Sequence, residues 1–443
     1  MSAARSFPRP LEAPPIVRVG MLGCGVVGAA TARILQDHAE DIAQRAGAAI
    51  ELRRVAVRDV TKVRPVALDR SAWTDDPYAV VRDPEIDVVV ELIGGVDPAR
   101  DLLVEAARRG KHVVSANKEV LSSFGREVMS AAEESGVDLL FEASVAGGIP
   151  IIRPLKESLA GDRVRRVMGI VNGTTNFVLT RMSETGASFE TALAEARRLG
   201  YAEADPSADI EGRDAAAKLA ILASIAFNAR VVIDDVVQEG IAGIRAEDVA
   251  AAHDLGYEIK LLAAAERDGE QVSARVQPAM VPQTHPLASV RGVFNAVFVE
   301  AEEAGELMFL GRGAGGPATG AAVVGDIVEI ARNLASGGRS AGCTCYLDRA
   351  RIEPRARTRM RFYVVLAVVD RPGVLASVAG VFARHGVSIA SVRQEGFGVE
   401  ARLAIITHVS DEGSHTATFA GLARLDVVKR IESTIRVMGT DEG

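Results

Sequence analysis

A glycine-rich loop near the start of the chain constrains the possible fold more than any other feature. Residues 16–22 form a short apolar run that ends at Gly23, and the sequence GCGVVG then leads into residues 29–36, which have helical character. A strand, a tight turn and a helix in this order open a parallel α/β sheet and point the helix N-terminus at a phosphate group. Because this whole context is present, we favour a dinucleotide-binding loop over a glycine turn that binds nothing.

The pattern that follows predicts a Rossmann-type, doubly wound α/β sheet. Helical segments alternate with strand-like runs at 50–57, 86–92, 111–115 and 139–143. Strands that alternate with helices give a parallel sheet with right-handed crossovers. We therefore assign residues 16–145 to a dinucleotide-binding domain. The proline-rich residues 1–15 fit a disordered tail rather than a signal peptide.

A chain of 443 residues is too long for one core, so further domains are expected. Strands and helices mix over residues 146–317, which predicts an α+β domain for catalysis and dimerisation. A glycine loop at its end precedes a helix at 318–334, which we expect to return to the first domain. Residues 335–360 have the composition of a linker, and residues 361–438 have the strand and helix order of a ferredoxin-like domain.

Composition and charge exclude several classes of protein. The formal net charge of −8 argues against a nucleic-acid binder. No apolar run reaches the roughly 18 residues of a membrane span, so no membrane partner is expected. Only three cysteines occur, which favours a reducing, cytoplasmic compartment and no disulfide framework. The spacing of Cys343 and Cys345 does not match a CxxC redox or zinc pair.

The end of the second expected strand, Arg58-Asp59, bears on the choice of dinucleotide. A guanidinium at Arg58 would match the 2′-phosphate of NADP(H), whereas a carboxylate at Asp59 would hold the 2′-hydroxyl of NAD(H). Both side chains could also be solvated loop charges. We favour NADP(H) and leave NAD(H) open.

Lysines are scarce in this chain, and one of them ends a predicted strand. Only seven of the 51 basic residues are lysines, so a retained lysine suggests a need for a compact ammonium group. Lys118 follows Ser115 at a strand's carboxyl end, where ligands of open α/β sheets bind. There it could stabilise negative charge that develops on a carbonyl oxygen. The alternative is an ordinary surface lysine.

The densest group of polar residues lies in the segment 200–218. Asp214 and Lys218 are four residues apart, on one face of a helix, and only alanines separate them. The helix continues with apolar residues, so the ammonium would be partly removed from water and could donate a proton. Carboxylates at Glu203, Asp205 and Asp209 could hold a substrate ammonium. The competing interpretation is a surface salt bridge beside an acidic loop. No histidine falls in these motifs, which favours lysine as the proton carrier.

The stretch from Glu142 to Pro150 closes another strand. Its carboxylate and a run of carbonyl groups could bind a hard monovalent cation. By spacing alone, a domain hinge is the better interpretation.

Together these segments resemble the homoserine dehydrogenase family over roughly residues 16–340. The segment 200–218 is specific to that family, whereas the glycine loop is not. The other matching segments are Ser115–Lys118, Glu142–Pro150, Gly169–Phe177 and Gly311–Gly316. The resemblance implies a cytosolic homo-oligomer, dimer or tetramer, that interconverts aspartate 4-semialdehyde and homoserine in threonine, methionine and isoleucine biosynthesis.

The resemblance also implies residue roles. Lys218 corresponds to the proton donor to the nascent alkoxide, and Lys118 to a lysine beside cofactor and substrate. Asp214 takes part in catalysis and, with Glu203, binds substrate, to which the acidic segment adds Asp209. Cofactor contacts would be Val26, Val27, Gly200 and Gly316, beside Gly23, Gly25, Gly28, Arg58 and Lys118. A sodium site would comprise Glu142, Val145, Gly147 and Ile149, which replaces the hinge interpretation. Many members have leucine, glycine and threonine at positions 24–26, and the family uses NADP, NAD or both.

The C-terminal stretch resembles an ACT domain. A strand at 362–369 is followed by Asp370-Arg371-Pro372-Gly373-Val374-Leu375, a signature turn into a helix. The backbone at Gly373 can approach a ligand, and the helix N-terminus can receive a carboxylate. We expect an effector site at Asp370, Gly373, Val374 and Leu375, with L-threonine as effector. The alternative is a dimerisation module that senses nothing.

Two other function classes fit parts of the sequence. A hydroxy-acid dehydrogenase resembling phosphoglycerate dehydrogenase can also carry an ACT domain, but its glycine loop lies mid-chain and its acid is a histidine. A catalytically silent amino-acid sensor would keep the glycine loop and Gly373 but not both lysines. Because both lysines are present, the reductase is favoured.

Overall fold

The computed structural model describes residues 15–340, 342–395 and 401–439. The expected tail at 1–15 lies almost wholly outside the described residues. The chain divides into two compact units, one comprising the described parts of 1–157 and 314–346, the other comprising 158–313 and the described parts of 347–443. Each unit is built around its own sheet.

The first unit contains a six-stranded parallel sheet. Its strand order is β3-β2-β1-β4-β5-β6. The strands are β1 (Ile16–Leu22), β2 (Ala49–Ala56), β3 (Trp73–Thr74), β4 (Val88–Glu91), β5 (His112–Ser115) and β6 (Leu139–Leu140). This order is that of dinucleotide-binding folds. The predicted Rossmann-type sheet is confirmed, although the sequence analysis missed the short β3 at its edge.

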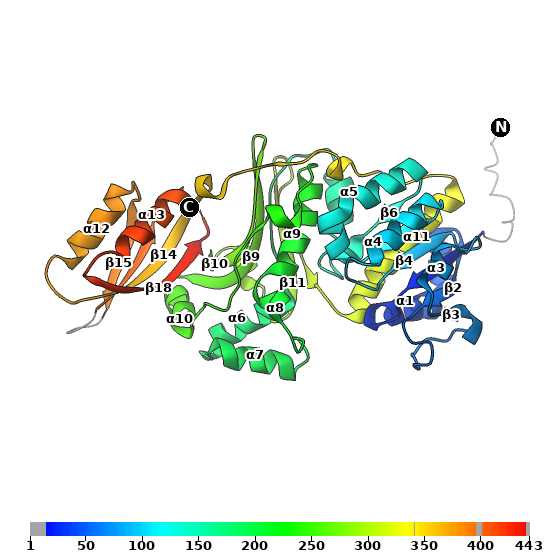
Figure 1. Cartoon of the computed structure of the whole chain (residues 1–443), viewed down its shortest axis with the longest axis horizontal. Coiled ribbons are helices and arrows are strands. Elements are labelled where there is room, and N and C mark those ends of the chain that lie inside the picture. The colour runs from blue at the N-terminus through cyan, green and yellow to red at the C-terminus, as the bar shows by residue number, and fades with distance from the viewer. Residues whose placement is uncertain (1–14, 341, 396–400, 440–443) are drawn as a thin grey trace, which may run out of the picture. The chain divides into compact units, whose positions relative to one another are not determined.

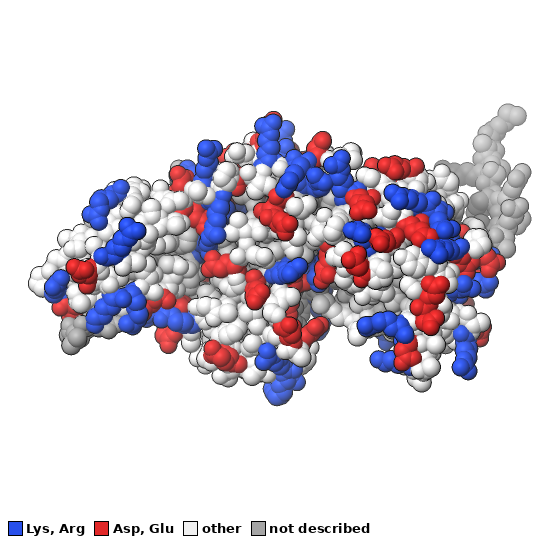
Figure 2. All heavy atoms as spheres, viewed as in Figure 1, with Lys and Arg blue, Asp and Glu red and all other residues white. Residues whose placement is uncertain are grey.

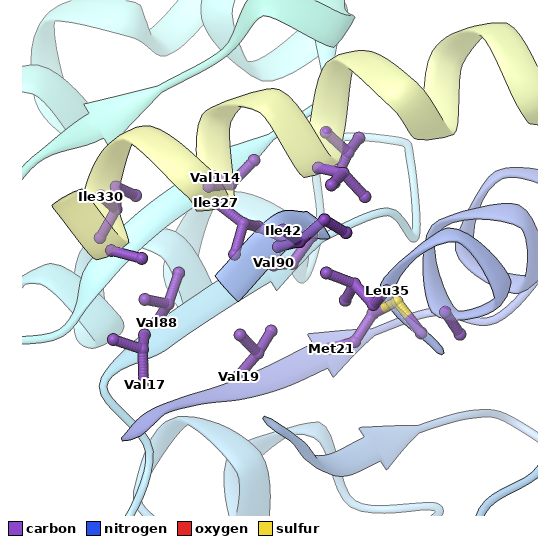
Figure 3. Packing of buried hydrophobic residues seen from close by; sticks show 14 of the residues in the cluster. Val17, Val19, Met21, Leu35, Ile42, Val88, Val90, Val114, Ile327 and Ile330 are labelled. Carbon is purple, nitrogen blue, oxygen red and sulfur yellow. The ribbon is translucent and has the colours of Figure 1, made fainter. Parts of the chain in front are cut away.

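Helices cover this sheet (Figure 1). They are α1 (Val26–Asp37), α2 (Ala39–Ala46), α3 (Pro77–Val81), α4 (Ala99–Arg108), α5 (Lys118–Ser135) and α11 (Gly316–Ser336). Helix α11, from far along the sequence, packs Ile327 and Ile330 against Val17 and Val88 of the sheet (Figure 3). Its apolar face thus completes the core beside the glycine loop.

The second unit begins with strands and helices that form an α+β structure. Its antiparallel strands are β7 (Val164–Ile170), β9 (Tyr257–Asp268), β10 (Gln271–Pro282), β11 (Phe294–Ala301) and β12 (Gly305–Arg312). Its helices are α6 (Gly173–Thr185), α7 (Phe189–Arg198), α8 (Ser207–Ile210), α9 (Arg213–Ala226) and α10 (Ala246–Asp254). The sequence predicted a mixture of strands and helices here, but β9, β12 and α6 were not located from it.

The C-terminal segment adds a βαββαβ module to the same sheet. Its elements are β14 (Arg359–Val368), α12 (Val374–Arg384), β15 (Ile389–Glu395), β16 (Ala401–Thr407), α13 (Glu412–Leu422) and β18 (Val428–Val437). The strand order β18-β14-β16-β15 is that of the expected ferredoxin-like fold. Strand β18 also pairs with β10 in parallel through Ala279 and Met280, so one sheet continues through both parts of this unit.

The segment between α11 and β14 carries its own contacts. Strand β13 (Arg351–Ile352) pairs with β10, and Ala350 N donates to Arg230 O at 2.9 Å. Cys343 and Cys345, which were not paired in the sequence analysis, are joined in a disulfide with their Cα atoms 5.2 Å apart.

Acidic and basic side chains are interspersed on the face drawn in Figure 2. Within the described residues, no helix has the length and apolar character that crossing a membrane requires.

A buried ion cluster lies where β18 meets β10. Glu412 at the start of α13 accepts hydrogen bonds from Arg355 Nε at 2.8 Å, Arg436 Nη2 at 3.1 Å and Arg275 Nη1 at 3.2 Å. The side chains of Glu412, Arg436 and Arg275 are only 4%, 8% and 8% exposed. Because Arg275 belongs to β10 and Arg436 to β18, one carboxylate neutralises cations from both parts of the sheet.

We expect Glu412→Ala to destabilise the second unit strongly. Two buried guanidinium groups would lose their shared carboxylate, and removing one partner of a buried pair costs about 3–5 kcal/mol. Urea unfolding of the full chain measures this loss. The control is Glu270→Ala, because the ion pair of Glu270 with Arg351 is exposed and should contribute at most about 1 kcal/mol. Equal effects of the two substitutions would contradict a special role for Glu412.

The pH dependence of this contribution has a definite sign. Burial raises the pKa of Glu412, but the hydrogen bond from Arg355 and the charge of Arg436 outweigh it and hold the pKa below 4.5. The cluster's contribution is therefore complete above the unfolded pKa and is lost as the pH falls through the lower folded pKa.

Candidate functional site

A large cavity opens at the carboxyl ends of the strands in the first unit. Its volume is about 1150 Å³, above the roughly 300–1,000 Å³ of ordinary ligand pockets. The residues that line it include Gly23, Gly25, Val26, Arg58, Lys62, Arg64, Ile93 and Gly94. Four of the predicted cofactor contacts thus share one cavity.

The glycine loop has the close contacts that its pattern predicts. A Cβ on Gly28 would lie 2.4 Å from Gly23 O, so only glycine allows α1 to pack on the turn. A Cβ on Gly316 would lie 2.9 Å from Val26 O, which brings the start of α11 against the start of α1. Val26 itself is 76% exposed toward the cavity. The backbone of the loop is therefore accessible to a pyrophosphate, whose natural position is the N-terminus of α1.

The loop after β2 holds three cations around one carboxylate. Asp59 accepts hydrogen bonds from Thr61 N at 2.8 Å and Thr61 Oγ1 at 2.6 Å, and the Thr61 hydroxyl and amide lower the pKa of Asp59. Arg64 donates to the carbonyls of Cys24, Asp59 and Lys62. Arg58 and Lys62 are exposed on the cavity wall. The sequence analysis missed Lys62 and Arg64, because it considered only the last residues of the strand.

A buried carboxylate fixes the neighbouring strand ends. Glu91 accepts from Ser115 Oγ at 2.8 Å and from Ile93 N at 2.9 Å, and burial raises its pKa. Asn117 caps α5 and donates from Nδ2 to Gly95 O at 2.7 Å. Lys118 is the first residue of α5 and is half-buried. These hydrogen bonds fix the backbone from which the Lys118 side chain extends, at the carboxyl edge of the sheet.

The carboxylate of Glu142 is already bound to backbone groups. Oε1 accepts from Ile151 N at 2.6 Å and Ile152 N at 2.8 Å, and Oε2 accepts from Arg153 N at 2.9 Å. Any cation held by Glu142, Val145, Gly147 and Ile149 would therefore rely mainly on their carbonyl oxygens. The groups available there fit a weakly held monovalent cation better than a divalent one.

The second unit contains the predicted pair of Lys218 and Asp214, and both side chains are largely buried. Lys218 Nζ donates to Asp214 Oδ2 at 2.7 Å and to Val171 O at 2.7 Å. The two side chains are 12% and 9% exposed. An ammonium group has three N–H donors, so one remains for a substrate oxygen. The alternative of a surface salt bridge is wrong, because both groups lie within the packed interior around α9.

An asparagine that the sequence analysis did not single out completes this cluster. Asn172 Nδ2 donates to Asp209 Oδ1 at 2.7 Å and to Asp214 Oδ2 at 2.8 Å. Asp209 lies on α8 and is half-buried. Asp209 and Asp214 follow Asn172 by 37 and 42 positions in the sequence, and both bind its amide group.

The other predicted residues of this unit lie on the acidic loop or in the ACT module. Gly200 and Glu203 are exposed on the loop before α8. In the ACT module, Gly373 has φ of 87° and caps α12, whose first residue, Val374, is buried. Asp370 and Leu375 are exposed on either side of this turn.

Comparisons with known proteins agree with this geometry. The sequence profile described as "Homoserine dehydrogenase" matches residues 150–328, and that of "Homoserine dehydrogenase, NAD binding domain" matches residues 23–142. The profile of the ACT domain matches residues 362–414. The chain belongs to the homoserine dehydrogenase family. It is accordingly an oxidoreductase with a nicotinamide-binding domain and a C-terminal ACT domain, as predicted.

Relatives match along nearly the whole chain. The homoserine dehydrogenase of Mycobacterium tuberculosis is 51% identical over 435 residues, 96% of this chain and 98% of that protein. The homoserine dehydrogenase of Corynebacterium glutamicum is 47% identical over 426 residues, 95% of each protein.

Solved structures of the family share the fold. A homoserine dehydrogenase from Thiobacillus denitrificans has a TM-score of 0.92 and 41% identity, covering 97% of this chain and 99% of that chain. A hyperthermophilic archaeal homoserine dehydrogenase in complex with NADPH has a TM-score of 0.61 and 26% identity, covering 71% of this chain and 97% of that chain.

Proposed function

We propose that the chain reversibly reduces L-aspartate 4-semialdehyde to L-homoserine, with Lys218 as the group that protonates the substrate oxygen. The observation that supports this role is the buried pair of Lys218 and Asp214 at the start of α9. Asp214 Oδ2 and Val171 O orient the ammonium and leave one N–H for the substrate. Glu203 and Asp209, on the adjacent loop and helix, would hold the substrate's own ammonium.

When bound, a nicotinamide dinucleotide would supply the hydride for the aldehyde carbon, or take it from homoserine in the reverse direction. Lys218 gives its proton to the oxygen as the negative charge develops there. Lys118 adds a second positive charge beside cofactor and substrate. Residues 16–145 and helix 318–334 would bind the dinucleotide, and residues 146–317 would hold the substrate and form the dimer contacts of a cytoplasmic homo-oligomer. A sodium ion would lie against the carbonyl groups of Glu142, Val145, Gly147 and Ile149.

Lys218→Ala should remove most turnover and spare dinucleotide binding. The loss of a general acid typically costs about 10²–10⁴-fold in rate. Steady-state kcat with homoserine and fluorescence titration with NADPH measure the two properties. Lys156→Ala is a suitable control, because Lys156 is a partly buried lysine of the other unit. Near-normal turnover of Lys218→Ala would rule out this mechanism.

The preferred cofactor is proposed to be NADP(H). Arg58 and Lys62 present two cations on the cavity wall, whereas the carboxylate of Asp59 is bound by Thr61 within its own turn. Two cations suit a 2′-phosphate, and a carboxylate bound in this way is less suited to a ribose hydroxyl.

Arg58→Ala should weaken NADPH binding far more than NADH binding, by about 1.5–3 kcal/mol for the lost charge-assisted contact. Fluorescence titration with both dinucleotides measures the difference. Arg53→Ala, which removes an exposed arginine of β2, is the control and should change neither affinity. Equal losses of the two dinucleotides in Arg58→Ala would favour NAD(H) and Asp59.

We also propose that the ACT module senses L-threonine at Asp370, Gly373, Val374 and Leu375. The N-terminus of α12 is suited to the amino acid's carboxylate, and the exposed Asp370 to its ammonium. A short route leads from the module to the substrate loop. Arg436 of β18 bonds to Glu239, and Ile241 N donates to Ile210 O at 2.9 Å, next to Asp209.

Threonine should therefore inhibit the full chain partially and saturably, and Glu239→Gln should weaken that inhibition. Allosteric coupling is typically about 1–3 kcal/mol. The ratio of rates with and without threonine is measured across a titration, with calorimetry to follow threonine binding. Glu266→Gln, which alters an exposed ion pair with Arg166, is the control and should keep the full response. If threonine neither binds nor inhibits, the module is a dimerisation module or senses another amino acid.

A further inference from the structure

We propose that Asn172 is a positioning residue for the reaction. By donating one hydrogen bond to each of Asp209 and Asp214, it fixes the positions of both carboxylates and aims Lys218 at the substrate oxygen. This inference rests on the proposed role of Lys218. It gives the residue a function beyond that of a helix cap.

The geometry leaves Asn172 one orientation. Its Oδ1 accepts from Thr175 N at 2.9 Å and from Thr175 Oγ1 at 3.0 Å, which caps α6. The amide nitrogen must then face the two carboxylates, at 2.7 Å and 2.8 Å. An amide nitrogen carries two hydrogens, so each carboxylate receives one. The residue is 5% exposed, so water cannot readily replace these bonds.

The two carboxylates need these donors. Oxygens of Asp209 and Asp214 that bind the same nitrogen are close neighbours, and their like charges repel each other. The amide of Asn172 holds both carboxylates in place against that repulsion. The Asp214 oxygen that binds Asn172 is also the one that binds Lys218. A displacement of Asp214 would therefore weaken the contact that orients the catalytic ammonium.

The same backbone segment controls the lysine directly. Val171 O, which accepts the second hydrogen bond from Lys218 Nζ, belongs to the residue that precedes Asn172. The cap on α6 fixes this peptide, so the amide of Asn172 and the carbonyl of Val171 are positioned together. Any shift of Asn172 thus moves both acceptors of Lys218.

Among the described residues, Asp209 of α8 and Asp214 and Lys218 of α9 are the titratable groups in this cluster. The charged groups that other neighbours turn toward α6 bind it elsewhere. These are Lys260 of β9, bonded to Asn176; Glu258 of β9, bonded to Ser183; Glu195 of α7, bonded to Arg181; and Arg291, bonded to Glu184. A kinetic effect of substitutions at Asn172 therefore reports on the two aspartates and the lysine.

Two substitutions distinguish the helix-capping role of Asn172 from its role as a hydrogen-bond donor to the carboxylates. Asn172→Ser and Asn172→Asp both keep an oxygen that suits an N-cap position, so α6 should stay folded. Both lose the two N–H donors, and Asn172→Asp adds a third negative charge. Ser188→Ala is the matched control, because Ser188 caps α7 through Thr191 N and lies outside the cluster.

We expect kcat to fall by about tenfold or more in Asn172→Ser, since small displacements of catalytic groups cost up to about 10²-fold. The fall in kcat should be larger in Asn172→Asp, because its added negative charge would repel both carboxylates. The KM for the dinucleotide should stay that of the parent. Ser188→Ala should lower Tm and leave kcat unchanged.

Two results would overturn the inference. A parental kcat in both Asn172 variants would make Asn172 a helix cap only. An equal fall of kcat in Asn172→Ser and Ser188→Ala would show that the loss comes from helix stability and not from the position of Lys218. Circular dichroism and Tm of each variant establish that a folded protein is being assayed. Near-normal turnover of Lys218→Ala would instead count against the proposed proton donor, so the two failures are distinguishable.

Discussion

The catalytic part of this chain depends on the buried carboxylate of Asp214. It joins α9, which carries Lys218, to the strand end that carries Asn172. A buried carboxylate is tolerated only when it is paired and hydrogen-bonded. Here a single oxygen accepts from both an ammonium and an amide, and this satisfies the carboxylate while fixing the directions of its neighbours. The same contacts that make burial possible also fix the position of the Lys218 ammonium.

A second buried carboxylate, Glu412, has a comparable role between the two parts of the second unit's sheet. Strands β10 and β18 pair through only two residues of each strand. Backbone pairing of that extent is a weak join, and the shared neutralisation of Arg275 and Arg436 reinforces it. Arg436 also bonds to Glu239, so a displacement of β18 would move the loop whose Ile241 bonds to Ile210. The join therefore has the connections that communication between effector and substrate would need.

The sequence predicted those features that are local or periodic. The glycine loop, the strands of the first sheet, the pair on α9 and the turn at Gly373 are each specified within a few neighbouring residues. Strand β9 was missed because its central alanines favour a helix, and its pairing with β7 and β10 overrides that preference. The three amides that bind the carboxylate of Glu142 begin nine residues later, so these contacts could not be predicted from the sequence. Asn172 was overlooked for the same reason, since both of its carboxylate partners are distant in sequence.

Helix α9 shows why part of this site could be predicted from the sequence. Ala215, Ala216 and Ala217 are buried and small, which lets the helix pack closely on β9 and β10. Close packing removes water from Asp214 and Lys218, which are held by the same helix one turn apart. Larger side chains between them would hold the sheet away and admit solvent, and the pair would become an ordinary surface salt bridge of little energetic value. The alanines thus matter to this pair, because they determine the dielectric environment of its two charges.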